Sequence, residues 1–250
     1  MKKLLQDTFE LFKDIRNSNV CIKDNNANSM SKEYVLFYFL MKSSGYNGKP
    51  NVLKEEDYEK LNLIPLYRGY EKYEYGRNQL IDEDYHYGVG ALYGDGIYFT
   101  TSKEEAYGYT FPRGISFGQK NHNRVVESKI DAQNVIDFND LVIIKAYLQS
   151  KLKGKETEKQ KVVKEYSDKI DEILTFIGSI EDKRLGYEFA LYLLENYSSI
   201  AILLGADGIL HQKGGREYLV SIDRRTICVT ESTINRFIEG ASKEANESEK

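Results

Sequence analysis

The chain of 250 residues has little of several residue types, and each shortage excludes a class of protein. Its two cysteines, Cys21 and Cys228, lie far apart and predict neither a disulfide framework nor a metal site. Its three histidines, His86, His122 and His211, are scattered and complete no zinc-binding pattern. No apolar run approaches the roughly 20 residues of a membrane span. Tryptophan is absent, whereas tyrosine occurs 20 times and offers aromatic surface for a ligand pocket.

The overall composition indicates a globular protein. The chain is 41% hydrophobic and 30% charged, and its length fits one large domain with a sizeable core. Gln6, Asp7 and Glu10 interrupt the apolar stretch that a signal peptide needs, so we expect a cytoplasmic location. The net charge of −4 gives no overall field for nucleic acid and leaves only a local basic groove open.

Apolar periodicity predicts helices at the front of the chain and again before its last strands. Residues 3–16 place apolar side chains at helical spacing, which predicts an amphipathic helix. Residues 32–42 are too apolar for a surface element; we interpret them as a buried helix, and a central strand is the alternative. Further helices are expected within 141–148, 162–177, 187–194 and 198–204, the last closed by Gly205.

Short apolar, β-branched segments predict strands between these helices. They lie at 63–68, 97–100, 124–130, 135–137, 208–210, 217–222 and 226–230. Pro65 marks the first of them as an edge strand or as a strand that starts there. Loops are expected at 24–31, 70–93, 111–123 and 211–216, and disorder from 241 to 250. The chain therefore reads as one α+β domain at 1–240, with a helical N-terminal cap at 1–60 and a core at 63–230 that includes a helical block at 141–204.

One stretch, residues 92–109, combines a turn, a strand and a helix start. Gly94 and Gly96 predict a turn, residues 97–100 a strand, and Thr101 or Ser102 the N-cap of a helix. A strand that ends in hydroxyl groups beside a helix start is suited to hold a polar ligand. The glycines at 88–94 have one residue too many for a dinucleotide-binding fingerprint and lack its strand–helix frame, so we reject that interpretation.

Three separated pieces of sequence resemble the ADP-ribosyltransferase superfamily when they are taken in order. They are residues 66–69 (LYRG), residues 94–102 (GDGIYFTTS) with Ala106 and Tyr107, and residues 217–227 (EYLVSIDRRTI). The nearest likeness is to bacterial and phage mono-ADP-ribosyltransferases whose middle motif is like that of the poly(ADP-ribose) polymerases. The resemblance covers about residues 63–230. It implies two small, packed, mostly antiparallel sheets that form an NAD-binding cleft.

The resemblance also implies which residues hold NAD+, the expected substrate. Arg68 stands where the arginine branch of the family has its NAD-binding arginine, and its planar fork suits a pyrophosphate or a ribose. The backbone of Gly69 would hold the nicotinamide carboxamide. The hydroxyl-rich strand end and the aromatic side chains of the slot would be Tyr98, Thr100, Thr101, Ser102, Tyr107 and Tyr109.

Glu217 corresponds to the family's catalytic glutamate, beside Arg68 and Tyr98 as the other expected catalytic residues. Cleavage of the nicotinamide–ribose bond builds oxocarbenium-like charge on the ribose, as in glycoside hydrolysis. A carboxylate beside the 2′-hydroxyl stabilises that charge, and the removal of such a preorganised group typically costs about 10²–10³ in rate. No metal is required.

Gly215 departs from the family pattern and leaves the acceptor open. Members that modify arginine carry Glu or Gln two residues before the catalytic glutamate, so Gly215 speaks against arginine as the acceptor. The sequence is compatible with a nucleic acid or with another protein side chain and selects neither. The resemblance implies a bacterial or phage toxin, defence or host-takeover effector, for which an antitoxin or immunity protein would be the partner. The alternatives are an NAD+ glycohydrolase, an RNA 2′-phosphotransferase, for which too few basic residues are found, and a non-catalytic interaction module.

Overall fold

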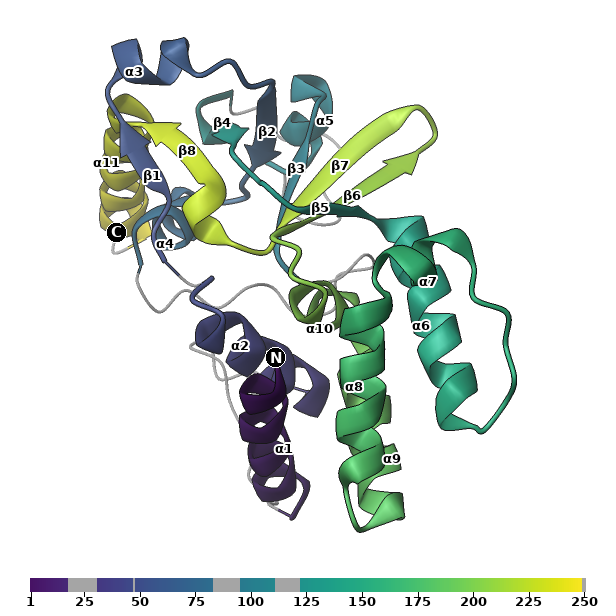
Figure 1. The fold of residues 1–250 in the computed structure, drawn as a ribbon. Helices are drawn as coiled ribbons and strands as arrows, with labels where there is room; N and C mark the ends of the chain where they lie inside the picture. Colours follow the sequence, from purple (N-terminus) through teal and green to yellow (C-terminus); the bar gives the residue numbers. More distant parts are fainter. Residues whose placement is uncertain (18–30, 47, 83–94, 111–121, 249–250) are drawn as a thin grey trace.

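The computed structural model describes residues 1–17, 31–46, 48–82, 95–110 and 122–248. The expected α+β class is confirmed: helices pack around one mixed sheet of eight strands (Figure 1). The expected loop at 24–31 lies largely outside the described residues, as do most of the expected loop at 111–123, the glycines at 88–94, Cys21 and His86.

The strands form a single sheet, so the expected pair of packed sheets is wrong. In spatial order they are β1 (Asn51–Leu53), β8 (Ile227–Thr230), β4 (Val125–Ile130), β2 (Pro65–Gly69), β3 (Ile97–Thr100), β7 (Arg216–Ser221), β6 (Gly208–Lys213) and β5 (Val135–Asp137). The β1–β8 and β5–β6 pairs are parallel and the other described pairs antiparallel. The two halves stay one sheet through the contact of β2 with β3, which share a single register pair, Tyr67 with Thr100.

A block of helices lies on one side of the sheet (Figure 1). Its members are α1 (Lys2–Asn17), α2 (Lys32–Ser43), α6 (Phe138–Leu152), α7 (Lys161–Glu165), α8 (Ser167–Ser179), α9 (Lys183–Glu195) and α10 (Tyr197–Leu203). Phe9 and Phe12 of α1 pack their rings 5.2 and 5.5 Å from that of Phe189 in α9, which buries the apolar face predicted from helical spacing.

Most of these helices were expected, with two refinements. Residues 32–42 form a helix and not a strand, and Ser31 caps it by accepting a hydrogen bond from the Tyr34 N–H at 3.2 Å. The helix expected at 162–177 is two helices, because the backbone of Tyr166 leaves helical geometry between α7 and α8. Gly205 closes α10 with a φ of 78°, as predicted.

The region before residue 60 is not wholly helical. After α2, β1 joins the sheet edge beside β8, and the short helix α3 (Glu55–Lys60) follows it. The sequence of β1, Asn-Val-Leu, contains a single β-branched residue and therefore gives little indication of a strand. None of the described helices has a stretch long and apolar enough to cross a membrane.

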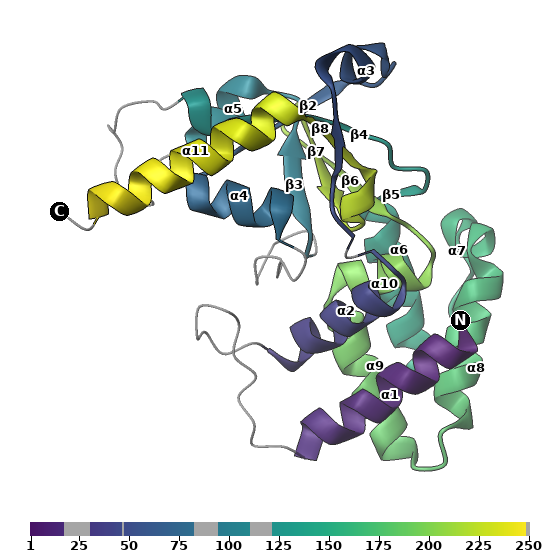
Figure 2. The same ribbon diagram turned by 90° about the vertical axis from the view of Figure 1, so that its left-hand side faces the viewer.

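The helices α4 (Tyr73–Ile81) and α11 (Glu231–Ser248) pack side by side (Figure 2), and both correct the sequence predictions. Residues 73–81 were expected to be loop, and residues 241–248 to be disordered. Gly76 of α4 faces the ring of Phe237, and Gly240 of α11 faces the ring of Tyr73, so a β-carbon on either glycine would overlap that ring. The two glycines thus allow the helices to pack closely. The low helix propensity of glycine is the reason that the sequence did not predict helices here.

The loop expected at 211–216 is instead a tight β-hairpin. β6 extends to Lys213, β7 starts at Arg216, and only Gly214 and Gly215 lie between them, with φ of 59° and 77°. Two positive φ values in a two-residue connection are typical of the hairpin turn whose twist matches its strands. The residues on both sides of the turn are therefore held in the sheet.

Candidate functional site

The three motifs of the sequence lie on three neighbouring strands. β2 carries Arg68, β3 carries Tyr98, and β7 carries Glu217, and these strands are adjacent in the order β2–β3–β7. The register pairs Tyr67 with Thr100, and Thr100 with Tyr218. Segments separated by more than a hundred residues in the chain thus meet at one place in the sheet.

Arg68 is half-buried and only partly satisfied. Its Nη1 donates to the backbone carbonyl of Tyr98 at 2.9 Å, and its guanidinium lies 5.2 Å from the centre of the Tyr70 ring. Its Nε is buried and has no hydrogen-bond partner among the described residues. The buried Nε atoms of Arg124 and Arg236 are likewise without a partner among the described residues, so this feature does not single out Arg68. What distinguishes Arg68 is its position, half-buried near the end of β2 and in contact with β3.

The backbone pairing between β2 and β3 ends at Tyr67 and does not include Arg68 or Gly69. Beyond Tyr67 and Thr100 the two strands share no register pair, and the Arg68 side chain reaches the Tyr98 carbonyl instead of a backbone group. On its other side, Gly69 is approached by the Ala106 carbonyl of helix α5 (Lys103–Gly108), so closely that a β-carbon would overlap that oxygen. Position 69 therefore requires glycine.

Glu217 lies on the same face of the sheet as Arg68. Alternation along each strand puts Arg68, Phe99, Leu219 and Glu217 on one face, given the register. Two strand spacings and two residues along β7 separate the two α-carbons by about 12 Å, which one extended ligand can span. Glu217 is exposed, and its Oε1 accepts from Gln212 Nε2 at 2.6 Å, across the hairpin.

The expected aromatic residues lie on the opposite face. The same alternation places Tyr98 with Thr100, under α5, where Tyr98 is half-buried against the core. Tyr107 of α5 is half-buried and Tyr109, directly after it, is 59% exposed. The structure therefore groups Arg68 with Glu217, and Tyr98 with α5, on the two faces of the same three strands.

The hydroxyl groups of the middle motif are used inside the protein. Ser102 caps α5, as predicted, by accepting from the Glu105 N–H at 3.2 Å. Thr100 is buried, and its hydroxyl donates to Glu105 Oε2 at 3.1 Å. The Thr101 N–H donates to the carbonyl of Glu217 at 3.4 Å, which links the motif to β7.

Glu105 is a site residue that sequence reasoning missed, because nothing in the sequence except its place in the first turn of α5 marks it. Besides the Thr100 hydroxyl, it accepts from the Tyr218 hydroxyl and pairs with Arg216 at 3.1 Å. The hydrogen bond to Glu105, together with burial, raises the pKa of Tyr218 above its ordinary value. A glutamate in a first helical turn usually interacts with the helix dipole, so only the fold reveals this cluster.

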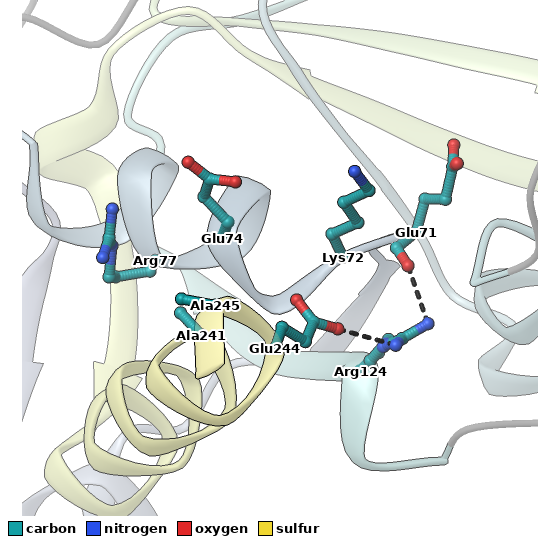
Figure 3. Close-up of a pocket in the computed structure, with 8 residues that line it drawn as sticks. All are labelled: Glu71, Lys72, Glu74, Arg77, Arg124, Ala241, Glu244 and Ala245. Atoms are coloured by element: carbon teal, nitrogen blue, oxygen red, sulfur yellow. Dashed lines mark hydrogen bonds and ion pairs between the residues drawn. The ribbon is translucent and has the colours of Figure 1, made fainter. Parts of the chain in front are cut away.

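A separate cavity of about 510 Å³ lies between the start of α4 and the end of α11 (Figure 3). Arg124 and Glu244 form an ion pair in it: Arg124 donates to Glu244 at 2.6 Å and also to the Glu71 carbonyl at 2.7 Å. Glu244 also accepts from the Tyr73 N–H at 3.0 Å and so caps α4. This arrangement explains how α11 is held in place. No group of His, Cys, Asp and Glu side chains suited to a metal ion occurs in the described part of the chain.

Comparison of the chain with family models, with curated proteins and with solved structures found no match. The fold and the site define an α+β protein in which two charged side chains, Arg68 and Glu217, share one face of three central strands.

Proposed function

We propose that the protein is an NAD+-dependent mono-ADP-ribosyltransferase. The supporting observation is that three motifs distant in the sequence converge on adjacent strands, with Arg68 and Glu217 on one face. A strand arrangement in which they lay apart would leave the motif resemblance without chemical meaning. We further propose that it is a bacterial or phage effector, toxin or defence protein.

In this proposal Arg68 binds the anionic part of NAD+. Arg68 is half-buried near the end of β2, and its planar guanidinium carries several N–H donors that a pyrophosphate or ribose oxygen would accept. Charge-assisted hydrogen bonds are about twice as strong as neutral ones, which makes the guanidinium the main anchor. The Gly69 backbone, where the β2–β3 ladder is not continued, would receive the nicotinamide carboxamide.

Glu217 would act on the ribose. The nicotinamide–ribose bond breaks heterolytically, nicotinamide leaves with the bonding electrons, and positive charge develops on the ribose. An exposed carboxylate at the sheet end stabilises this charge and orients the 2′-hydroxyl. The acceptor nucleophile then forms the new bond to the ribose and loses its proton.

A second candidate function is NAD+ glycohydrolase, and the hairpin turn is the observation that supports it. A loop was expected at 211–216, directly before Glu217, but Gly214 and Gly215 form a two-residue turn instead. Less surface is therefore available to recognise a macromolecule, and water becomes a competing acceptor. The identity of the acceptor, protein or nucleic acid, depends on residues beyond this turn.

The test is incubation of the protein with a bacterial lysate and NAD+ labelled in its adenylate part, with nicotinamide release measured in parallel. We expect release by the wild type and a loss of about 10²–10³-fold in Glu217→Gln. Glu127→Gln, which changes an exposed glutamate of β4, is the matched control and should keep full activity.

The labelled product then separates the candidates. Label removed by protease identifies a protein acceptor, and label removed by nuclease identifies a nucleic acid. If free ADP-ribose is the only labelled product, the protein is an NAD+ glycohydrolase. Absence of nicotinamide release by the wild type under all conditions contradicts the enzyme and leaves the interaction module.

A further inference from the structure

Glu105 holds the two residues that flank Glu217. On β7, Arg216 precedes Glu217 and Tyr218 follows it, and the side chains of both reach the Glu105 carboxylate. Glu105 itself is well shielded, with 11% of its side chain exposed, whereas Arg216 is 62% exposed. The carboxylate that organises this cluster is therefore the buried member.

The strand end that carries Glu217 has few other anchors. Arg216 and Glu217 are both exposed, and the two-glycine turn lies immediately before them. Apart from its pairing with β6, the backbone at Glu217 is held toward β3 by the Thr101 N–H at 3.4 Å, a long hydrogen bond. Backbone pairing therefore holds Glu217 mainly from the β6 side, and the contacts of Glu105 with both neighbours, called the clamp below, add side-chain anchors from α5.

The clamp acts from the opposite face of the sheet. Arg216 and Tyr218 alternate with Glu217 along β7, so their side chains point toward α5 while that of Glu217 points away. Glu105 lies on α5 and also accepts from Thr100 at the end of β3. It therefore joins α5, β3 and β7, the elements that carry Tyr107, Tyr98 and Glu217.

We propose that Glu105 is a positioning residue that sets the place of Glu217 through Arg216 and Tyr218. This inference rests on the proposed function for its consequence in catalysis. Glu105 does not touch the substrate. It fixes the backbone from which Glu217 projects and keeps α5, with Tyr107 and Tyr109, seated against the same strands.

The test compares Glu105→Gln with Glu104→Gln, the exposed neighbour on the same helix, in the full chain. Thr100 bonds Oε2 of Glu105, whereas Tyr218 and Arg216 bond Oε1. The amide in Glu105→Gln keeps only one acceptor oxygen and loses the charge that pairs with Arg216. We expect kcat for nicotinamide release to fall about tenfold, with KM for NAD+ changed less than about twofold. Glu104→Gln should match the wild type. Tyr218→Phe removes one of the two side chains that bond Glu105, so it should also lower kcat for nicotinamide release.

A double-mutant cycle separates positioning from general damage. If Glu105 works through Glu217, adding Glu105→Gln to Glu217→Gln should lower the residual rate by less than about twofold. An equal loss in both backgrounds, or a loss that appears in KM alone, overturns the proposal.

Amide hydrogen exchange provides a readout that does not need activity. The Thr101 N–H that bonds Glu217 should exchange several-fold faster in Glu105→Gln than in Glu104→Gln. Unchanged exchange overturns the clamp even if the enzyme is active. If exchange is faster but the wild type releases no nicotinamide, the positioning role of Glu105 is supported and the proposed function is wrong.

Discussion

Two arginines of the sequence motifs, Arg68 and Arg224, have opposite surroundings. Arg224, in the 3₁₀ turn Arg224–Thr226, is fully buried. Its Nη1 and Nη2 donate to the carbonyls of Asp82 and Gln79, at 2.9 and 2.8 Å, where α4 ends. Arg68 is half-buried, donates to one carbonyl, and has an Nε without a partner among the described residues.

The difference separates a structural arginine from a binding one. A cation at the end of a helix complements the helix dipole and satisfies carbonyls that lack intrahelical partners, so Arg224 completes α4. Arg68 donates to one carbonyl and is half-buried, so the contrast lies in its exposure and its fewer hydrogen bonds. Its Nε is not part of the contrast, since Arg124 and Arg236 also have a buried Nε without a partner among the described residues. Unused hydrogen-bonding capacity near the surface is what a ligand site retains.

The largest expected effect is on the free energy of unfolding, and it tests whether the two arginines differ in their structural role. Arg224→Met should lower the free energy of unfolding by about 3 kcal/mol or more, since it removes two charge-assisted hydrogen bonds of about 1.5–3 kcal/mol each. Arg68→Met, which removes one, should cost about half as much. Urea unfolding followed by circular dichroism measures both.

The control for this pair is Arg184→Met, because that side chain is 84% exposed and its change should stay within about 0.5 kcal/mol. Equal losses for Arg68→Met and Arg224→Met would show that both arginines are structural, and the comparison would then be wrong.

The sequence predicted elements that depend on local pattern. The amphipathic helix α1, the strands β2 and β3, and the Ser102 cap follow from spacing and residue type, and all are confirmed. Pro65, expected at an edge or at a first position, is the first residue of β2, a central strand.

Elements that depend on distant partners could not be predicted. α4 contains Gly76, which lowers its helix propensity, and only contact with Phe237 explains the glycine. Residues 241–248 read as a polar tail, yet Ala241 is buried and Glu244 bonds both Arg124 and the start of α4. The cluster around Glu105 likewise joins residues more than a hundred positions apart.

A smaller effect on stability is expected for a neutral buried donor, the hydroxyl of Tyr58. Tyr58 of α3 is buried, and its hydroxyl has no hydrogen-bond partner within the described ranges. Tyr58→Phe should therefore be neutral or stabilise the protein by up to about 1 kcal/mol at pH 7. The gain should be absent from Tyr218→Phe, whose hydroxyl bonds Glu105.

The same substitution has a pH dependence of known sign. Burial raises the pKa of Tyr58 above its ordinary value of about 10. The unfolded chain therefore loses this proton first, so the stability linked to it is present below about pH 10 and falls as the pH rises further. The advantage of Tyr58→Phe over the wild type should grow above that pH in thermal unfolding, and a constant difference would contradict the assignment.

The most direct test of the central claim, that Arg68 and Glu217 share a site for NAD+, is the affinity for NAD+ by isothermal titration calorimetry. We predict that the wild type binds NAD+, that Arg68→Gln weakens binding about tenfold or more, and that Arg184→Gln leaves it unchanged. Equal affinity of the wild type and Arg68→Gln, or no binding by a folded wild-type protein, would contradict the claim.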